Sequence, residues 1–136
     1  MPTQIFVNMQ VNDLQRSMAF YKAIGWKFNQ AFTNDDAACL VISDTIYAML
    51  HTANSIRRFV PKGRKVINAA KQTEVLLAVS VEKRKSVDTM RAKALKAGGS
   101  EVRPAEDHGW MYGHTFSDPD GHIWELLWID PKTDQA

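Results

Sequence analysis

The sequence has one cysteine, no long apolar run and little net charge. The single Cys39 excludes a disulfide within the chain, and its neighbours in the run AACLVI favour a buried structural thiol over a nucleophile. No run reaches the roughly 20 apolar residues that span a bilayer, and the N-terminus lacks the basic start and apolar core of a signal peptide. We therefore expect a cytoplasmic protein with no membrane partner.

Acidic residues are absent from one long stretch of the chain. No Asp or Glu occurs between Thr45 and Thr73, where six basic side chains do occur: Arg57, Arg58, Lys62, Arg64, Lys65 and Lys71. This basic segment is either a solvated loop or a surface that attracts an anionic ligand. The net charge of +2 is small, and Phe59 is the only aromatic residue among these charges, so we expect no nucleic acid partner.

The length and the 45% hydrophobic content suit one globular domain with a real core. The first half predicts a strand over 5–11 and then a helix that Asn12 or Asp13 begins and Gly25 ends. Three further strands are predicted over 26–32, 37–42 and 45–51. A long connection follows over 53–72, with a short helix near 56–59.

The second half repeats the order of the first. It predicts a strand over 74–81, a helix over 83–97, a short strand over 101–103 and a final hairpin. We therefore predict an α+β fold for residues 1–136, in which two βαβββ modules, 1–52 and 73–131, are joined by loop 53–72. The two modules form an eight-stranded open cup with the helices outside, and its concave face suits a small ligand.

The final hairpin contains the first candidate for chemistry. A tight turn at Asp118-Pro119-Asp120-Gly121 predicts that His114 lies opposite Glu125 and Phe116 opposite Ile123. Glu125 and His114 then share a face and are our candidate catalytic residues, with Glu125 as a general base. The alternative is a buried pair that only fixes the hairpin.

Residues on the predicted inner face are our candidates for ligand contact. Asn8 and Gln10 give the first strand a polar face, and Trp110, Tyr112 and Phe116 form an aromatic wall. The full set of ligand-binding candidates is Phe6, Asn8, Gln10, Met49, Trp110, Tyr112 and Phe116. Trp124 and Trp128 are predicted to lie on the opposite face, against a helix or a subunit. His51 at the mouth of the cup and His108 in a loop are weaker candidates.

Three segments resemble one family. VNDLQRSMAFYKAIGW, ALKAGGSEV and SDPDGHIWELLW are similar to the opening, middle and closing motifs of the vicinal oxygen chelate superfamily. That superfamily includes glyoxalase I, extradiol dioxygenases and bleomycin-resistance proteins. The resemblance covers nearly the whole chain at the expected spacing, and it implies a homodimer with a small-molecule pocket.

The same resemblance implies where a divalent metal would bind. The four ligand positions of the family fall on Phe6, Met49, Leu76 and Glu125, of which only Glu125 is a metal-binding residue type. One carboxylate does not hold a divalent ion, because such ions need several ligands. We therefore expect a pocket without the usual metal. The alternative is an unusual divalent site in which Glu125 is joined by some of Asn8, His51, Glu74 and His114.

Four functions remain after these observations. The first is a protein that binds or sequesters a small anionic or aromatic molecule. The alternative is a glyoxalase-type, metal-dependent lyase or isomerase that uses Glu125 with non-standard ligands. An iron-dependent dioxygenase ranks below it, because the motif positions supply no histidine. A dimeric interaction module without a ligand is the fourth.

Overall fold

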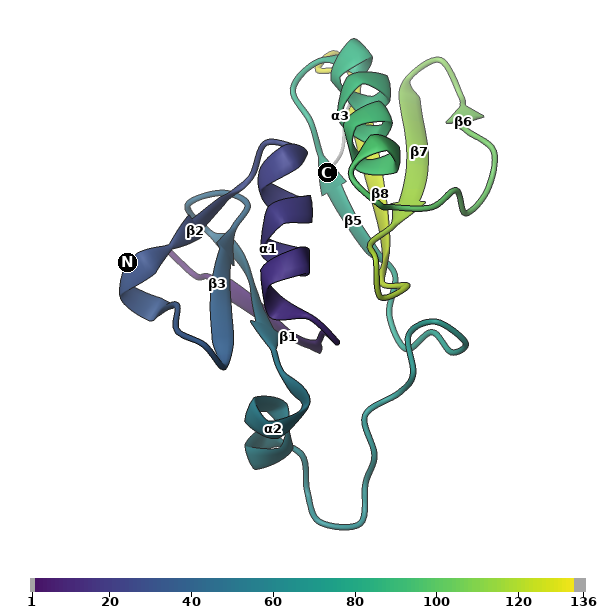
Figure 1. The fold of residues 1–136 in the computed structure, drawn as a ribbon. Helices are drawn as coiled ribbons and strands as arrows, with labels where there is room; N and C mark the ends of the chain where they lie inside the picture. Colours follow the sequence, from purple (N-terminus) through teal and green to yellow (C-terminus); the bar gives the residue numbers. More distant parts are fainter. Residues whose placement is uncertain (1, 134–136) are drawn as a thin grey trace. The chain divides into compact units, whose positions relative to one another are not determined.

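The computed structural model describes residues 2–133, and the chain divides into two compact units, Met1–Ile67 and Asn68–Ala136. Each unit contains one open, four-stranded mixed sheet with a long helix on one face (Figure 1). The α+β class and the two βαβββ modules are therefore confirmed. The joining of the two sheets into one cup stays a prediction.

The first unit has the strand order β1-β4-β3-β2. Strands β1 and β4 are parallel, and the other neighbours are antiparallel. The elements are β1 (Ile5–Gln10), α1 (Leu14–Ala23), β2 (Lys27–Asn29), β3 (Ala37–Val41) and β4 (Ile46–His51). The predicted strand 26–32 is shorter than expected, because the Asn29 side chain accepts from the Ala31 amide and begins the 3₁₀ turn η1 (Gln30–Phe32).

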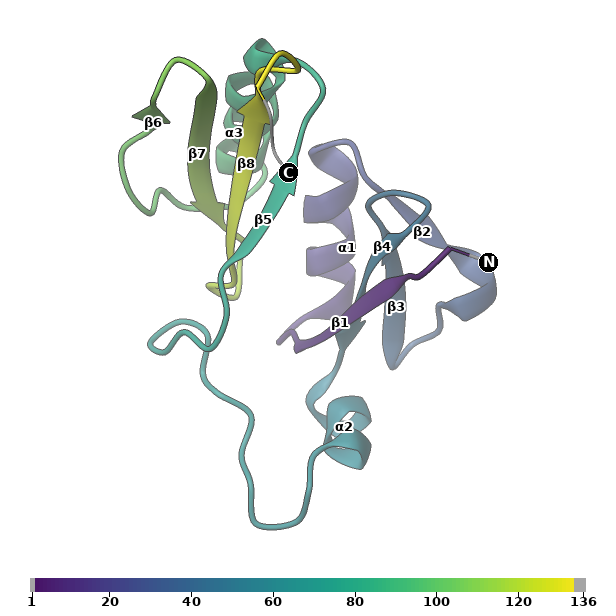
Figure 2. The ribbon, with the colours of Figure 1, turned by 180° about the vertical axis from the view of Figure 1, so that it is seen from behind.

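Helix α1 begins and ends where the sequence indicates. The Asp13 carboxylate accepts a hydrogen bond from the Arg16 amide at 3.1 Å, so Asp13 and not Asn12 is the N-cap. Gly25 follows the helix with φ of 110°, which suits a residue without a side chain. Helix α1 packs against the sheet beside β3 and β4 (Figure 2). Alternate residues of these two strands are fully buried, namely Ala38, Leu40, Ala48 and Leu50.

A short helical segment follows β4. The Thr52 hydroxyl accepts from the Ser55 amide at 3.3 Å and caps α2 (Ala53–Ile56), which continues into the 3₁₀ turn η2 (Arg57–Phe59). The predicted short helix is present and begins three residues earlier than expected. The first two residues of the basic segment, Arg57 and Arg58, are therefore in this helical segment, a few residues after the end of β4.

The second unit has the strand order β5-β8-β7-β6, with β5 parallel to β8. Its elements are β5 (Leu77–Ser80), α3 (Arg84–Lys96), β6 (Glu106–Asp107), β7 (Met111–Ser117) and β8 (Ile123–Ile129). The predicted strand over 101–103 is wrong. Ser100 makes one isolated bridge to Ser117, and pairing resumes only at β6, beyond Pro104, which has no amide hydrogen to donate.

The turn between β7 and β8 is held by one carboxylate. Asp118 Oδ1 accepts from the amides of Asp120, Gly121 and His122 at 3.0, 2.9 and 2.8 Å. Gly121 has φ of 105°, and a Cβ there would lie 2.5 Å from the Ala69 carbonyl oxygen. The turn therefore requires glycine for its backbone conformation and for its contact with the segment before β5.

Across residues 2–133, none of the helices combines the length and the apolar character that crossing a membrane requires.

Candidate functional sites on the two sheets

The register of the β7–β8 hairpin differs from the prediction by one residue. Thr115 lies opposite Glu125, His114 opposite Leu126 and Phe116 opposite Trp124. The reason is the turn, because the Asp118 amide donates to the His122 carbonyl and closes a loop one residue longer than expected. A shift of one residue reverses every side chain between faces. The prediction that His114 and Phe116 share a face with Glu125 is therefore wrong.

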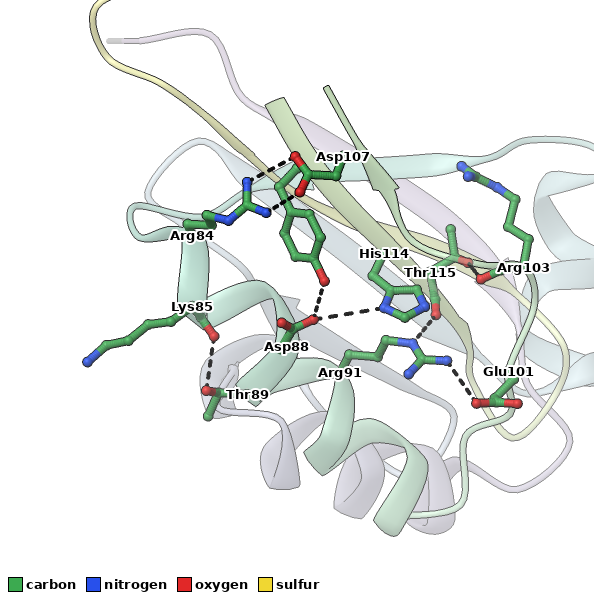
Figure 3. Close-up of polar contacts among 11 residues, drawn as sticks. Arg84, Lys85, Asp88, Thr89, Arg91, Glu101, Arg103, Asp107, His114 and Thr115 are labelled. Carbon is green, nitrogen blue, oxygen red and sulfur yellow. Dashed lines mark hydrogen bonds and ion pairs between the residues drawn. The ribbon is translucent and has the colours of Figure 1, made fainter. Parts of the chain in front are cut away.

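His114 instead lies on the α3 side of the sheet, within a polar cluster (Figure 3). Its Nδ1 atom is 3.9 Å from an Asp88 carboxylate oxygen, to which the Tyr112 hydroxyl donates at 2.7 Å. Burial, followed by the charge of Arg91, lowers the pKa of His114. Phe116 is fully buried on the same side. Tyr112 and Phe116 therefore anchor α3 to β7 and do not form the predicted aromatic wall.

Arg84 and Arg91 extend this cluster along α3. Arg84 pairs with Asp107 of β6, and its guanidinium lies 4.2 Å from the centre of the Tyr112 ring. The hydrogen bond from Arg84 holds the pKa of Asp107 below its usual value. Arg91 donates to the Thr115 carbonyl oxygen at 2.8 Å and to Glu101 at 3.2 Å (Figure 3). The cluster connects the helix to β6 and β7, which is a structural role.

Glu125 lies on the opposite face of this sheet, which we call the Glu125 face. Its partner is Arg103, whose guanidinium donates to Glu125 at 2.8 Å and to Glu106 at 2.9 Å. The pair is partly exposed, with 40% of the Arg103 side chain and 20% of the Glu125 side chain accessible. Gly113 leaves room for the carboxylate, because a Cβ there would lie 3.1 Å from Glu125 Oε2. Glu125 is therefore an ion-paired carboxylate that shares the Arg103 guanidinium with Glu106.

The sheet of the first unit has a second candidate surface, on the side away from α1. The ladder places Phe6 beside Tyr47, Asn8 beside Met49 and Gln10 beside His51. We call the set Phe6, Asn8, Tyr47, Met49 and His51 the Asn8 face. Phe6 is 46% exposed and Asn8 is exposed, so this face presents both an aromatic and a polar group.

The aromatic part of the Asn8 face is a stacked pair. The Phe6 and Tyr47 rings are 4.7 Å apart and nearly parallel, at 9°. The Tyr47 hydroxyl donates to the Asp44 carbonyl oxygen at 3.0 Å and accepts from the Gln4 amide group at 3.3 Å. These two hydrogen bonds hold the Tyr47 ring in place through its hydroxyl group. Phe6 therefore stacks against an ordered ring and is still 46% exposed.

The polar part is a chain of three side chains. The His51 ring is 3% exposed and makes two hydrogen bonds of 2.8 Å, from Nε2 to Asn8 Oδ1 and from Nδ1 to Ser55 Oγ. The Asn8 amide nitrogen donates to the Phe6 carbonyl oxygen at 3.4 Å, which directs Oδ1 toward His51. A carboxamide oxygen only accepts, so Nε2 has the proton and Nδ1 accepts from the Ser55 hydroxyl.

The neighbours of this chain of hydrogen bonds disfavour the charged form of His51. Burial, followed by the charge of Arg58, lowers the pKa of His51. The Phe59 ring lies 5.4 Å from the His51 ring, and the Arg58 guanidinium lies 5.3 Å from the centre of the Phe59 ring. Arg58 of the basic segment therefore lies near the polar end of the Asn8 face.

The residues at the family's metal positions do not fit a divalent ion. Phe6, Met49 and Leu76 supply no oxygen or nitrogen ligand from their side chains, and Glu125 is paired with Arg103. Within residues 2–133, no three His, Cys, Asp or Glu side chains come together in a way that would hold a metal. His51 uses both ring nitrogens in hydrogen bonds, so it is not an available ligand.

The structure brings together some of the sequence candidates and separates others. Phe6, Asn8 and Met49 share one face, with Gln10 next to His51 in the ladder. Trp110 is 52% exposed in the loop before β7, with its ring 6.3 Å from that of His108.

Two residues that contact the candidate residues were not predicted from the sequence, Arg103 and Ser55. No spacing in the sequence identifies them, although the pair Thr52 and Ser55 has the pattern of a helix cap.

A family model described as the Glyoxalase/Bleomycin resistance protein/Dioxygenase superfamily matches residues 4–126. A comparison with curated proteins found no match. Among solved structures, a hypothetical protein from S. aureus has 26% sequence identity and a TM-score of 0.76, with 95% of each chain covered. The fosfomycin resistance protein FosX from Mesorhizobium loti has 17% identity and a TM-score of 0.67, covering 96% of this chain and 95% of that one.

Proposed function

Because the chain belongs to the glyoxalase/bleomycin resistance protein/dioxygenase superfamily, we propose that it binds a small organic molecule on the Asn8 face, without the metal that the family's ligand positions would hold. The main support is the accessible Phe6 ring beside the polar Asn8 side chain. Small-molecule sites are lined mainly by apolar and aromatic side chains with a few fixed polar groups, and the Asn8 face supplies both kinds.

The donor chemistry favours binding over metal-dependent catalysis. A glyoxalase-type lyase or isomerase needs a metal with several protein ligands, and the positions Phe6, Met49 and Leu76 offer none. The carboxylate of Glu125 is engaged by Arg103. No residue of the Asn8 face supplies an acidic group, so we assign no bond-breaking step to it.

Two further properties belong to this proposal. The resemblance to the superfamily supports a homodimer, which light scattering during size-exclusion chromatography tests directly. The composition supports a cytoplasmic location, which fractionation of the cells that produce the protein tests.

Methionine methyl groups provide a test of ligand binding. We would label the chain with [methyl-¹³C]methionine and titrate it with a set of aromatic fragments. Met49 lies in the Asn8 face and reports on binding there. Met111, the first residue of β7, reports on the second unit. Met9 and Met18 are buried, at 6% and 7% exposure. We expect saturable shifts of the Met49 signal, with Met9 and Met18 unchanged.

The variant Phe6→Ala tests how much the aromatic ring contributes to this binding. It removes the accessible ring but keeps the strand and its ladder, so fragment affinity should fall about tenfold if stacking on Phe6 contributes as an aromatic pair does. Fragments that shift Met111 and leave Met49 unchanged would place the site on the second unit and contradict the proposal. The absence of any saturable shift would also contradict it.

A further inference from the structure

We propose that the Asn8 face selects ligands in which an anionic hydrogen-bond acceptor, such as a carboxylate, is attached to a flat aromatic body. This inference rests on the proposed binding function and adds the chemical class of the ligand. It follows from counting which hydrogen-bonding groups the face has already used and from the charges close to those that remain.

The acceptors at the polar end each make one short hydrogen bond already. Asn8 Oδ1 is engaged by the Nε2–H group of His51, and His51 Nδ1 is engaged by the Ser55 hydroxyl. The Asn8 amide nitrogen has two hydrogens, and its one bond, to the Phe6 carbonyl oxygen, is long at 3.4 Å. The amide nitrogen is therefore the part of Asn8 with the most unused hydrogen-bonding capacity, and as a donor it requires an acceptor on the ligand.

The charge near this donor is positive. Arg58 is the charged group that acts on His51, and its guanidinium packs over the Phe59 ring that contacts His51. Arg58 belongs to the stretch from Thr45 to Thr73 that contains six basic residues and no acidic one. The acidic residue closest in sequence to the face is Asp44, at the aromatic end, where its carbonyl oxygen accepts from the Tyr47 hydroxyl. Asp13 and Asp36 precede α1 and β3, and none of these three carboxylates is a charge partner of His51. An acceptor with negative charge is therefore favoured over a neutral one.

The aromatic preference comes from the other end of the same face. Phe6 is two residues before Asn8 on β1, so both side chains lie on the same face of the strand. The Phe6 ring is supported by Tyr47, whose hydroxyl has two hydrogen-bond partners. A flat ring placed on Phe6 therefore stacks on an ordered surface, with little loss of side-chain freedom on binding.

Three matched probes separate this inference from the binding function itself. They are 2-naphthoate, 2-naphthalenemethanol and 2-naphthylmethylammonium, which share one ring system and differ in the charge and hydrogen bonding of the attached group. Each is titrated into the full labelled chain at low salt, with the Met49 methyl shift as the signal. We expect 2-naphthoate to bind about tenfold more tightly than the alcohol, as charge-assisted hydrogen bonds do, and the ammonium most weakly.

Variants identify the groups responsible. Asn8→Asp keeps the shape of the side chain but replaces the donor with a negative acceptor, so it should weaken 2-naphthoate binding about tenfold or more and reverse the preference toward the ammonium probe. Arg58→Gln should weaken 2-naphthoate binding several-fold at low salt and reduce its salt dependence. Arg64→Gln is the control, because it removes a charge from the same segment without the contact to Phe59.

The outcomes are distinguishable. Equal affinity for all three probes, or preference for the ammonium in the wild-type chain, would overturn the inference while leaving the binding function intact. Failure of all three to bind would overturn both. Equal effects of Arg58→Gln and Arg64→Gln would reduce the charge argument to general attraction and contradict the role given to Arg58.

Discussion

The Arg103 guanidinium donates to the Glu125 carboxylate at 2.8 Å, across the face of the second sheet that lies away from α3. Arg103 comes from the irregular segment before β6, so the bond ties that segment to the central strand β8. The same guanidinium also reaches Glu106. Glu125 therefore has a structural partner, whether or not it meets a ligand.

A double-mutant cycle measures this pair. Arg103→Met and Glu125→Gln should each destabilise the chain, and the coupling between them should be roughly 0.5–1 kcal/mol, because both side chains are partly exposed. Urea denaturation at low salt provides the four free energies of unfolding. Arg84→Met with Glu125→Gln is the control cycle, with no expected coupling, since Arg84 pairs with Asp107 on the other face. Zero coupling for Arg103 would contradict the contact.

Two glycines with similar backbone angles should respond differently to alanine. Gly25 and Gly121 have φ of 110° and 105°, but only Gly121 has a backbone atom within reach of an added Cβ. Gly25→Ala should cost about 1 kcal/mol of unfolding free energy for its left-handed conformation. Gly121→Ala should cost about 1–3 kcal/mol more, because the Ala69 backbone must move. Equal losses in urea denaturation would show that the Ala69 contact is not tight.

The hydrogen bond between His51 and Ser55 should contribute measurably to stability. Ser55→Ala leaves the buried Nδ1 atom of His51 without a partner, which costs about 1–3 kcal/mol. Ser43→Ala, at an exposed position of the same unit, should change stability by less than about 0.5 kcal/mol. If denaturant unfolding gives the same small loss for both variants, water replaces the Ser55 hydroxyl and the chain of hydrogen bonds is not closed.

Acid should destabilise the protein through His51. Its pKa is lower in the folded chain than its usual value of about 6.5, so between the two values the unfolded chain binds a proton that the folded chain does not. The free energy of unfolding should therefore fall as the pH decreases below about 6.5. His51→Gln should make this fall shallower between pH 7.5 and 5. The remaining slope includes His114, whose pKa is lowered in the same direction. An unchanged slope in His51→Gln would contradict the assignment.

Local signals in the sequence predicted the modules well. The Asp13 cap, Gly25 and the repeated order of strands and helix all depend on neighbours within a few residues, so pattern and propensity suffice. The hairpin register failed for an equally local reason. The Asp118 carboxylate binds three successive amides and lengthens the loop by one residue, which a turn motif alone does not predict.

The sites were less predictable because they depend on distant residues. Asn8 and His51 are 43 residues apart and meet only because β1 pairs with β4. Asn8 was a candidate from its alternating strand, but its partner and its donor role follow from the ladder. Arg103 reaches Glu125 from 22 residues away in an irregular segment, where no periodicity exists to assign a face.

The most direct test of the account is the affinity of 2-naphthoate for the full chain, measured by calorimetry in EDTA and again with excess zinc or nickel. We predict the same dissociation constant in all three conditions, since the Asn8 face has no metal ligand to contribute. Binding that is absent in EDTA and restored by one equivalent of metal would contradict the account. It would favour the alternative function, a metal-dependent lyase or isomerase that uses Glu125.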